Sequence, residues 1–220
     1  MVVDTFLKKQ LWERRFAMAE LSDVKWKEFS LTEIFPIIKR GKRLKKSDHL
    51  CGAIPYVSST ATSNGVDGFI GNQGRVRVFN DCLTVANSGS VGSTFYHSYQ
   101  FIASDHVTQL KREGLDKYAY LFLAPLVQRL SEKYSFNREI NDDRLKREKL
   151  IIPVNERGEM DFEFMSNYMR EIEIRTLKPI IDKLCIRLIH SEISGGVIRY
   201  IRIGNRSLYP KYSQYYRVSA

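Results

Sequence analysis

Two adjacent carboxylates, Asp142 and Asp143, come nearest in this chain to a catalytic arrangement. Clustered carboxylates can hold a divalent ion that activates water against a phosphodiester. The pair is surrounded, however, by Arg138, Arg144, Lys146 and Arg147. An intrachain salt-bridge cluster explains the two acids more simply than a metal centre does. A metal-dependent DNA nuclease that uses Asp142 and Asp143 is therefore kept as an alternative and not as the leading hypothesis.

Other catalytic patterns are missing from the sequence. The four histidines occur singly, and no cysteine pair accompanies them at zinc-ligand spacing. The glycine-rich stretch at 89–93 is followed by strand-like residues, and not by the helix N-terminus that would cradle a phosphate. We therefore expect no catalytic residue, no bound metal and no cofactor on this chain.

Basic residues dominate the charge. Lys and Arg number 35 against 25 Asp and Glu, which gives a net charge of +10 and favours a polyanionic partner. Six of the eight residues in KRGKRLKK, the first basic segment (residues 39–46), are Lys or Arg. Such side chains position a protein on phosphates without reading bases. The candidates for phosphate contacts are Lys42, Arg43, Lys45 and Lys46, with Arg144, Lys146 and Arg147 in a second basic segment (residues 137–147).

Two polar stretches, at 58–65 and 86–93, interrupt apolar strand-like runs with Gly, Ser, Thr and Asn. Loops of this composition on a rigid scaffold often carry recognition. The candidates for contacts with base edges are Ser58, Ser59, Thr60, Thr62, Ser88 and Ser90, and with longer reach Arg75, Arg77, Asn137 and Arg138. For any single hydroxyl, capping of the turn is the competing explanation. Phe69, Phe79, Phe95 and Tyr96 are expected to face the core.

The elements that must position these residues are short strands followed by helices. Alternation and turn residues predict a strand around Trp26 and Phe29, one helical turn at 31–35, and a final strand at 150–154. Further strands are predicted at 54–57, 68–71, 76–79, 82–87, 93–97 and 106–110, as in an antiparallel or mixed sheet. A helix at 115–134 should kink or break at Pro125, and a long helix from Asp161 should be interrupted at Pro179.

Three widely separated cysteines fit a reducing cytoplasm, where buried thiols are their expected role. The first residues lack the apolar core of a signal peptide, and no run approaches the roughly 20 apolar residues that span a bilayer. We therefore expect a cytoplasmic protein with no membrane partner.

The order of the motifs resembles a known family. IPYVSSTATSNGVDGFI, LTVANSGSVGSTFYH, FIASDHVTQL, YLFLAPLVQR and KYSFNREINDDRLKREKLIIPV precede a long helix. This order is similar to that in the target recognition domain of type I restriction-modification specificity subunits. The resemblance implies an α/β (α+β) fold, in which a twisted mixed β-sheet with flanking helices is followed by a long spacer helix. It also implies a domain that performs no catalysis.

We expect four parts in the chain, of which the resemblance covers roughly residues 24–190. These are an N-terminal helical segment (1–23), the recognition domain (24–158), a helical spacer (159–194) that docks a partner, and a basic tail (195–220). The domain would read one half of a bipartite double-stranded DNA site for an adenine-N6 methyltransferase. S-adenosylmethionine is expected to bind only to that methyltransferase partner. A restriction subunit is a further implied partner, and a homodimer through the spacer helix is another option. A non-catalytic protein-interaction scaffold is the third hypothesis, beside the nuclease.

Overall fold

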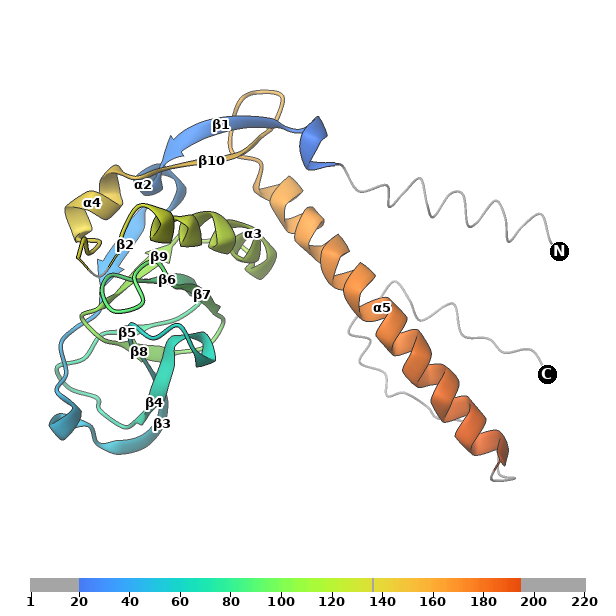
Figure 1. The fold of residues 1–220 in the computed structure, drawn as a ribbon, viewed down its shortest axis with the longest axis horizontal. Coiled ribbons are helices and arrows are strands. Elements are labelled where there is room, and N and C mark those ends of the chain that lie inside the picture. Colours follow the sequence, from blue (N-terminus) through green and yellow to red (C-terminus); the bar gives the residue numbers. More distant parts are fainter. Residues whose placement is uncertain (1–19, 136, 195–220) are drawn as a thin grey trace. The chain divides into compact units, whose positions relative to one another are not determined.

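The computed structural model describes residues 20–135 and 137–194 (Figure 1). The chain divides into two compact units, Met1–Ile174 and Arg175–Ala220, and helix α5 (Phe162–Ser194) crosses the boundary. Most of the predicted N-terminal helical segment and all of the basic tail lie outside the described residues. Leu21–Asp23, the described end of the former, form a 3-10 turn, η1.

The first unit is built from three small sheets. The strands β1 (Lys25–Ser30) and β10 (Lys149–Val154) form an antiparallel pair. An antiparallel four-stranded sheet has the order β2 (Ile37–Arg40), β9 (Val107–Lys111), β6 (Cys82–Ala86), β7 (Thr94–His97). The second four-stranded sheet has the order β4 (Val66–Ile70), β3 (Cys51–Val57), β8 (Phe101–Ala103), β5 (Val78–Phe79). This last sheet is mixed, because β3 and β8 run parallel.

Helices connect and cover these sheets. They are α2 (Leu31–Ile34), α3 (Lys117–Gln128), α4 (Asp142–Arg147) and α5, with 3-10 turns η2 (Lys46–Asp48), η3 (Ser63–Gly65) and η4 (Arg129–Glu132). The predicted mixed α/β class and the long C-terminal helix are confirmed. The strands divide into separate sheets because β3, β4, β5 and β8 pair only among themselves.

The main core lies between α3 and the β2-β9-β6-β7 sheet, which α3 covers in Figure 1. Tyr120, Leu123 and Leu83 are fully buried there. Ser30 caps α2 with a capping box, in which its side chain accepts from the Glu33 amide and the Glu33 carboxylate accepts from the Ser30 amide. These contacts create a rigid base from which the polar loops project.

The start of α5 is fixed to the first unit by polar and aromatic contacts. Asp116 caps α3 and also accepts from Ser166 Oγ at 2.7 Å and from the Arg170 guanidinium. Phe164 and Tyr168 of α5 pack edge-on against Phe122 of α3 at centroid distances of 6.3 and 5.7 Å. Residues 162–174 therefore belong to the body of the first unit.

The expected interruption of the long helix at Pro179 and the expected burial of Cys51 were wrong. Both prolines lie inside helices without a break, Pro125 in α3 and Pro179 in α5; a kink at Pro125 stays a prediction. The lost hydrogen bond at Pro125 is offset by the burial of α3, whereas around Pro179 the exposed helix can be hydrated. Cys51 is exposed and only Cys82 is buried, where burial raises the pKa of its thiol to about 12. The side chain of Cys185 lies outside the described residues.

Strand β8 was not predicted. It contains three fully buried residues and shows no alternation that would mark a strand. Among residues 20–135 and 137–194, no helix combines the length and the apolar character needed to cross a bilayer.

Candidate nucleic-acid interface

The first basic segment begins in β2; its backbone is hydrogen-bonded at Gly41 and Lys42, and the side chain of Asn72 holds the residues just beyond its end. The Gly41 amide donates to the Val107 carbonyl at 2.8 Å, and the Lys42 amide donates to the Ala103 carbonyl at 3.0 Å. A Cβ atom on Gly41 would lie 2.0 Å from the Ser104 carbonyl oxygen, so this approach requires glycine. At the far end, Asn72 accepts from the Leu50 amide at 2.9 Å and donates to the Asp48 carbonyl at 2.8 Å.

The side chains of this segment extend into solvent. Lys42, Arg43, Lys45 and Lys46 are all exposed. None of the four side chains has a hydrogen-bond or ion-pair partner among the described residues. A fixed backbone with unpaired cationic side chains is the arrangement expected of a phosphate-contacting loop.

The two polar loops contact each other beside this segment. In the first loop, the Ser58 amide donates to the Gly65 carbonyl at 2.9 Å. In the second, the Ser90 amide donates to the Ser59 carbonyl at 3.1 Å. Gly89 has a φ of 61°, and a Cβ atom there would lie 2.9 Å from Ser59 Oγ. The loops that the sequence separates by about 30 residues therefore form one surface.

Asn87 fastens the second loop to elements on either side. Its backbone amide donates to the His106 carbonyl at 2.8 Å, and its carbonyl accepts from the Ile140 amide at 3.0 Å. With its side-chain oxygen facing Arg40, Asn87 accepts from that guanidinium at 2.7 and 2.8 Å. Arg40 also forms an ion pair with Asp142 at 3.3 Å.

This pairing supports an intrachain salt bridge for Asp142, with a partner other than the basic neighbours that surround it in the sequence. The partner of Asp142 is Arg40 on β2, and not a basic neighbour in its own segment. Asp142 and Asp143 occupy the first turn of α4, where the helix dipole favours acids. Arg147 bonds the backbone carbonyl of Asp143 at 3.0 Å and not its carboxylate.

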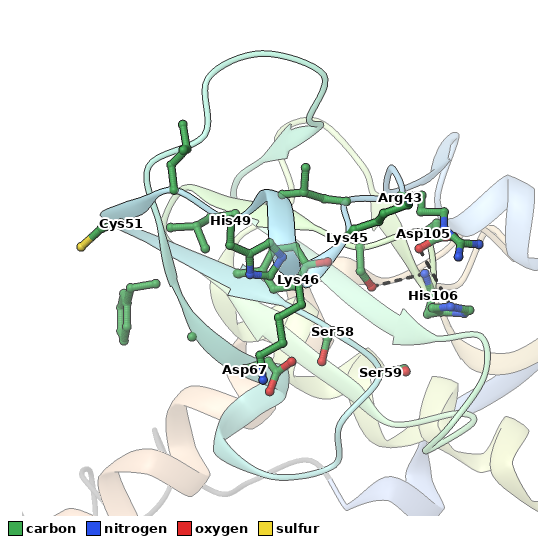
Figure 2. A pocket seen from close by; sticks show the side chains of 17 residues that line it. Arg43, Lys45, Lys46, His49, Cys51, Ser58, Ser59, Asp67, Asp105 and His106 are labelled. Carbon is green, nitrogen blue, oxygen red and sulfur yellow. Dashed lines mark hydrogen bonds and ion pairs between the residues drawn. The ribbon is translucent and has the colours of Figure 1, made fainter.

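A hollow of about 590 Å³ opens between the first basic segment, the first polar loop, β4 and residues 104–106 (Figure 2). The predicted residues Arg43, Lys45, Lys46, Ser58 and Ser59 line it. In Figure 2, Cys51 lies at one edge, and Arg43, Asp105 and His106 gather at the other. The structure thus brings phosphate candidates and base-edge candidates to the same place.

Polar and aromatic groups that line the hollow interact with each other and with residues behind it. Ser88 Oγ and His106 Nδ1 share a hydrogen bond, and the imidazole is about half exposed. Burial raises the pKa of Tyr56, with smaller contributions from the negative charges of Asp105 and Asp67. The phenol is therefore neutral at physiological pH, and it packs edge-on against His49 at 4.6 Å.

The remaining predicted residues do not line the hollow. The hydroxyl groups of Thr60 and Thr62 are hydrogen-bonded to each other at 3.0 Å, which is the competing explanation of turn capping. The Arg77 guanidinium donates to the Arg40 carbonyl. Lys42, Arg75, Ser88, Ser90, Asn137, Arg138, Arg144, Lys146 and Arg147 also lie outside its lining. Arg144 donates to the Glu139 carbonyl at 2.7 Å, and the Arg138 guanidinium lies 5.4 Å from the centre of the Tyr134 ring.

Several residues of the hollow were missed by the sequence reasoning. They are His49, Leu50, Cys51, Asp67, Asp105 and His106, and also Phe69, which was wrongly expected to face the core. Phe79 is buried as expected, whereas Phe69 is 62% exposed. The Ser-Asp-His break between two apolar runs at 104–106 was the available signal for the third loop.

Comparison with known proteins identifies the family. A family model described as the type I restriction modification DNA specificity domain matches residues 23–182. This chain belongs to that family. The specificity subunit S.BcgI of a type II restriction enzyme from Heyndrickxia coagulans is 32% identical over 158 residues, which cover 71% of this chain and 46% of that protein.

A solved structure supports the fold of the DNA specificity domain. The S subunit of a type I restriction-modification system from M. genitalium superposes with a TM-score of 0.53 at 16% identity, covering 86% of this chain and 49% of that one. The chain therefore spans about half the length of the relatives that it matches.

Membership of the DNA specificity domain family resolves the three hypotheses. The family provides DNA specificity in restriction-modification systems, is not catalytic and uses no cofactor itself. The predicted family and the non-catalytic role are confirmed, and the nuclease and the scaffold are set aside. In the part of the chain that the structure describes, no three His, Cys, Asp or Glu residues are grouped to hold a metal ion.

Proposed function

We propose that this chain is a sequence-specific double-stranded DNA-binding module that directs an adenine-N6 methyltransferase and restriction complex in the cytoplasm. The observation that carries the proposal is the hollow at which a fixed basic segment meets the first polar loop and residues 104–106, in a DNA specificity domain. In this proposal Lys42, Arg43, Lys45 and Lys46 contact phosphates, and the loop residues around Ser58 and Ser59 address base edges.

The module reads one half of a bipartite site. Its single recognition domain (24–158) and the spacer (159–194), together with its coverage of about half of each relative, support this proposal. The other half-site is read by a second recognition domain, either on a second copy or on another subunit. S-adenosylmethionine belongs to the methyltransferase partner.

The spacer helix supplies the docking surface. Leu177, Ile180, Ile181 and Leu184 are exposed at the three- and four-residue spacing of a packing seam. A methyltransferase subunit is the proposed occupant, and a second copy of this chain is the competing one. Substituting Ile180→Glu and Leu184→Glu should abolish co-purification with the methyltransferase; loss of self-association with co-purification intact would favour the homodimer.

The test of DNA binding compares two sets of four charge neutralisations. Changing Lys42, Arg43, Lys45 and Lys46 to Gln should weaken binding to every duplex alike. It should also lower the slope of log affinity against log salt by about 3 to 4, since each phosphate contact contributes about 0.9. The control set is Lys25, Lys27, Arg129 and Arg157, which are exposed and do not line the hollow.

The control set loses the same net charge and should retain most of the affinity and the slope. Equal effects of the two sets would show a general charge effect and would remove the phosphate assignment. If the unsubstituted chain shows no salt-sensitive binding to duplex DNA, the proposed function is overturned. Mapping methylated adenines in a cell that carries the chain and its cognate methyltransferase would identify the site.

A further inference from the structure

Phe69 and Leu50 are the most exposed large apolar side chains in the described part of the chain, at 62% and 61%. Both line the hollow that also contains Arg43, Lys45 and Lys46. Their exposure is unfavourable in water, and two exposed apolar side chains in a hollow that basic side chains also line fit a ligand that is both anionic and partly apolar. A phosphate backbone alone would leave these two side chains without a partner.

Strand β4 presents two different chemistries on one face. Asp67 and Phe69 are exposed, and Ile70 is buried on the other face. Side chains two positions apart on a strand lie about 7 Å from each other on the same side. Pairing with β3 places Phe69 opposite Pro55, so the strand backbone is fixed.

The combination of a carboxylate acceptor and an apolar ring matches groups of the DNA major groove. Adenine and cytosine both present an amino donor there, but only an A·T pair presents an amino donor together with the apolar methyl group of thymine. The minor groove presents no methyl group, and phosphates repel a carboxylate. The major groove also admits a two-stranded β-ribbon, and β3 and β4 form an antiparallel pair joined by the first polar loop.

We propose that the outward face of β4 reads A·T base pairs in the major groove. Phe69, with Leu50, contacts a thymine methyl group, and Asp67 accepts a hydrogen bond from an adenine amino group. Lys45 and Lys46 hold the adjacent phosphates and offset the charge of Asp67. The proposal rests on the function proposed above, because it assumes that the hollow faces duplex DNA.

The test uses the purified full chain and a library of duplexes with a randomised stretch. The sequence that the unsubstituted chain selects is then made with each thymine replaced in turn by deoxyuridine, which lacks only the methyl group. Burial of one methyl-sized group corresponds to about 0.8 kcal/mol, so one such replacement should weaken binding about fourfold. Phe69→Ala should bind the thymine duplex more weakly and should bind thymine and uracil equally at that position.

Two controls keep the outcome interpretable. Ile151→Ala removes an equally exposed side chain, at 59%, that does not line the hollow, and it should keep the fourfold preference. Thermal melting should show Phe69→Ala as stable as the unsubstituted chain, because its side chain is mostly in solvent. Asp67→Ala should relax the selection of adenine in the randomised library.

The outcomes separate the two proposals. If the unsubstituted chain selects a sequence but Phe69→Ala keeps its thymine preference, or if no thymine replacement matters, the role of β4 is overturned and the proposed function stands. If the unsubstituted chain selects no sequence at all, both are overturned.

Discussion

The two basic segments differ in the density of their charge and in their structural roles. In the first (residues 39–46), Lys42, Arg43, Lys45 and Lys46 have no side-chain partner among the described residues. In the second (residues 137–147), Arg144 and Arg147 donate to backbone carbonyls of their own segment. The first is held by its backbone and leaves these four charges available, whereas Arg144 and Arg147 of the second hold its own turn and short helix.

The anchoring also differs. The first segment depends on Gly41, whose backbone lies against the Ser104 carbonyl. The second depends on Ile140 and Leu145, which are fully buried in the main core. A run of Lys and Arg therefore indicates charge, and the partners of the individual guanidinium groups decide whether that charge is available for a ligand.

The largest expected effect tests the backbone anchor of the first segment. Gly41→Ala places a Cβ atom 2.0 Å from a backbone oxygen, so it should lower the free energy of unfolding by about 3 kcal/mol. Gly74→Ala, where a Cβ atom meets nothing within 4 Å, should change it little. Urea denaturation measures both, and a stable Gly41→Ala protein would show that this segment is not fixed as described.

Acid should weaken the sheets beneath the first segment. Burial lowers the pKa of His97 on β7 to about 4, and its ring packs at 4.5 Å from Phe101 on β8, the strand whose end holds Lys42. Below pH 6.5 the unfolded chain takes up a proton before the folded one does. The contribution of neutral His97 to the free energy of unfolding should therefore be fully present above pH 6.5. It should fall by up to about 3 kcal/mol as the pH decreases to 4.

Denaturation between pH 7 and pH 4 checks this expectation. His97→Gln should remove most of the pH dependence of the free energy of unfolding that His97 causes. The pH dependence caused by the carboxylates should remain. An unchanged pH profile in His97→Gln would show that the imidazole is not held neutral.

The guanidinium contacts of the second segment should contribute to stability. Arg144→Ala with Arg147→Ala removes two charged donors to backbone carbonyls, and should lower the free energy of unfolding by about 1–2 kcal/mol. Neutralising Lys42 and Lys45 in the first segment should stay within about 0.5 kcal/mol. Equal losses for the two pairs would remove the distinction between the segments.

The smallest effect concerns Lys146, which is exposed in the second segment. If this segment also lies along the DNA backbone, Lys146→Gln should reduce the salt slope by about one without altering the melting temperature. An unchanged slope would restrict phosphate contact to the first segment. Lys45→Gln serves as the comparison, with an expected reduction of about one.

Local patterns predicted most of the elements. The apolar alternation around Trp26, the turn at Ser30 and the helical period after Asp161 lie within stretches of a few residues, and they reappear as β1, α2 and α5. Helix α3 and strands β3, β4, β6, β7 and β9 were predicted for the same reason. Strand β8 was missed because its burial depends on parallel pairing with β3. This long-range contact produces no alternation of apolar and polar residues in the local sequence.

The sequence by itself determined the basic charge, the order of strands and helices, and the polar loops that placed this chain beside restriction specificity domains. Only the tertiary structure decided which of those residues share a surface. The contact between Ser59 and Ser90, the pairing of Arg40 with Asp142, and the outward position of Phe69 all depend on segments far apart in the chain. Periodicity reports how a segment meets its own neighbours, whereas a recognition site is formed where separate loops converge.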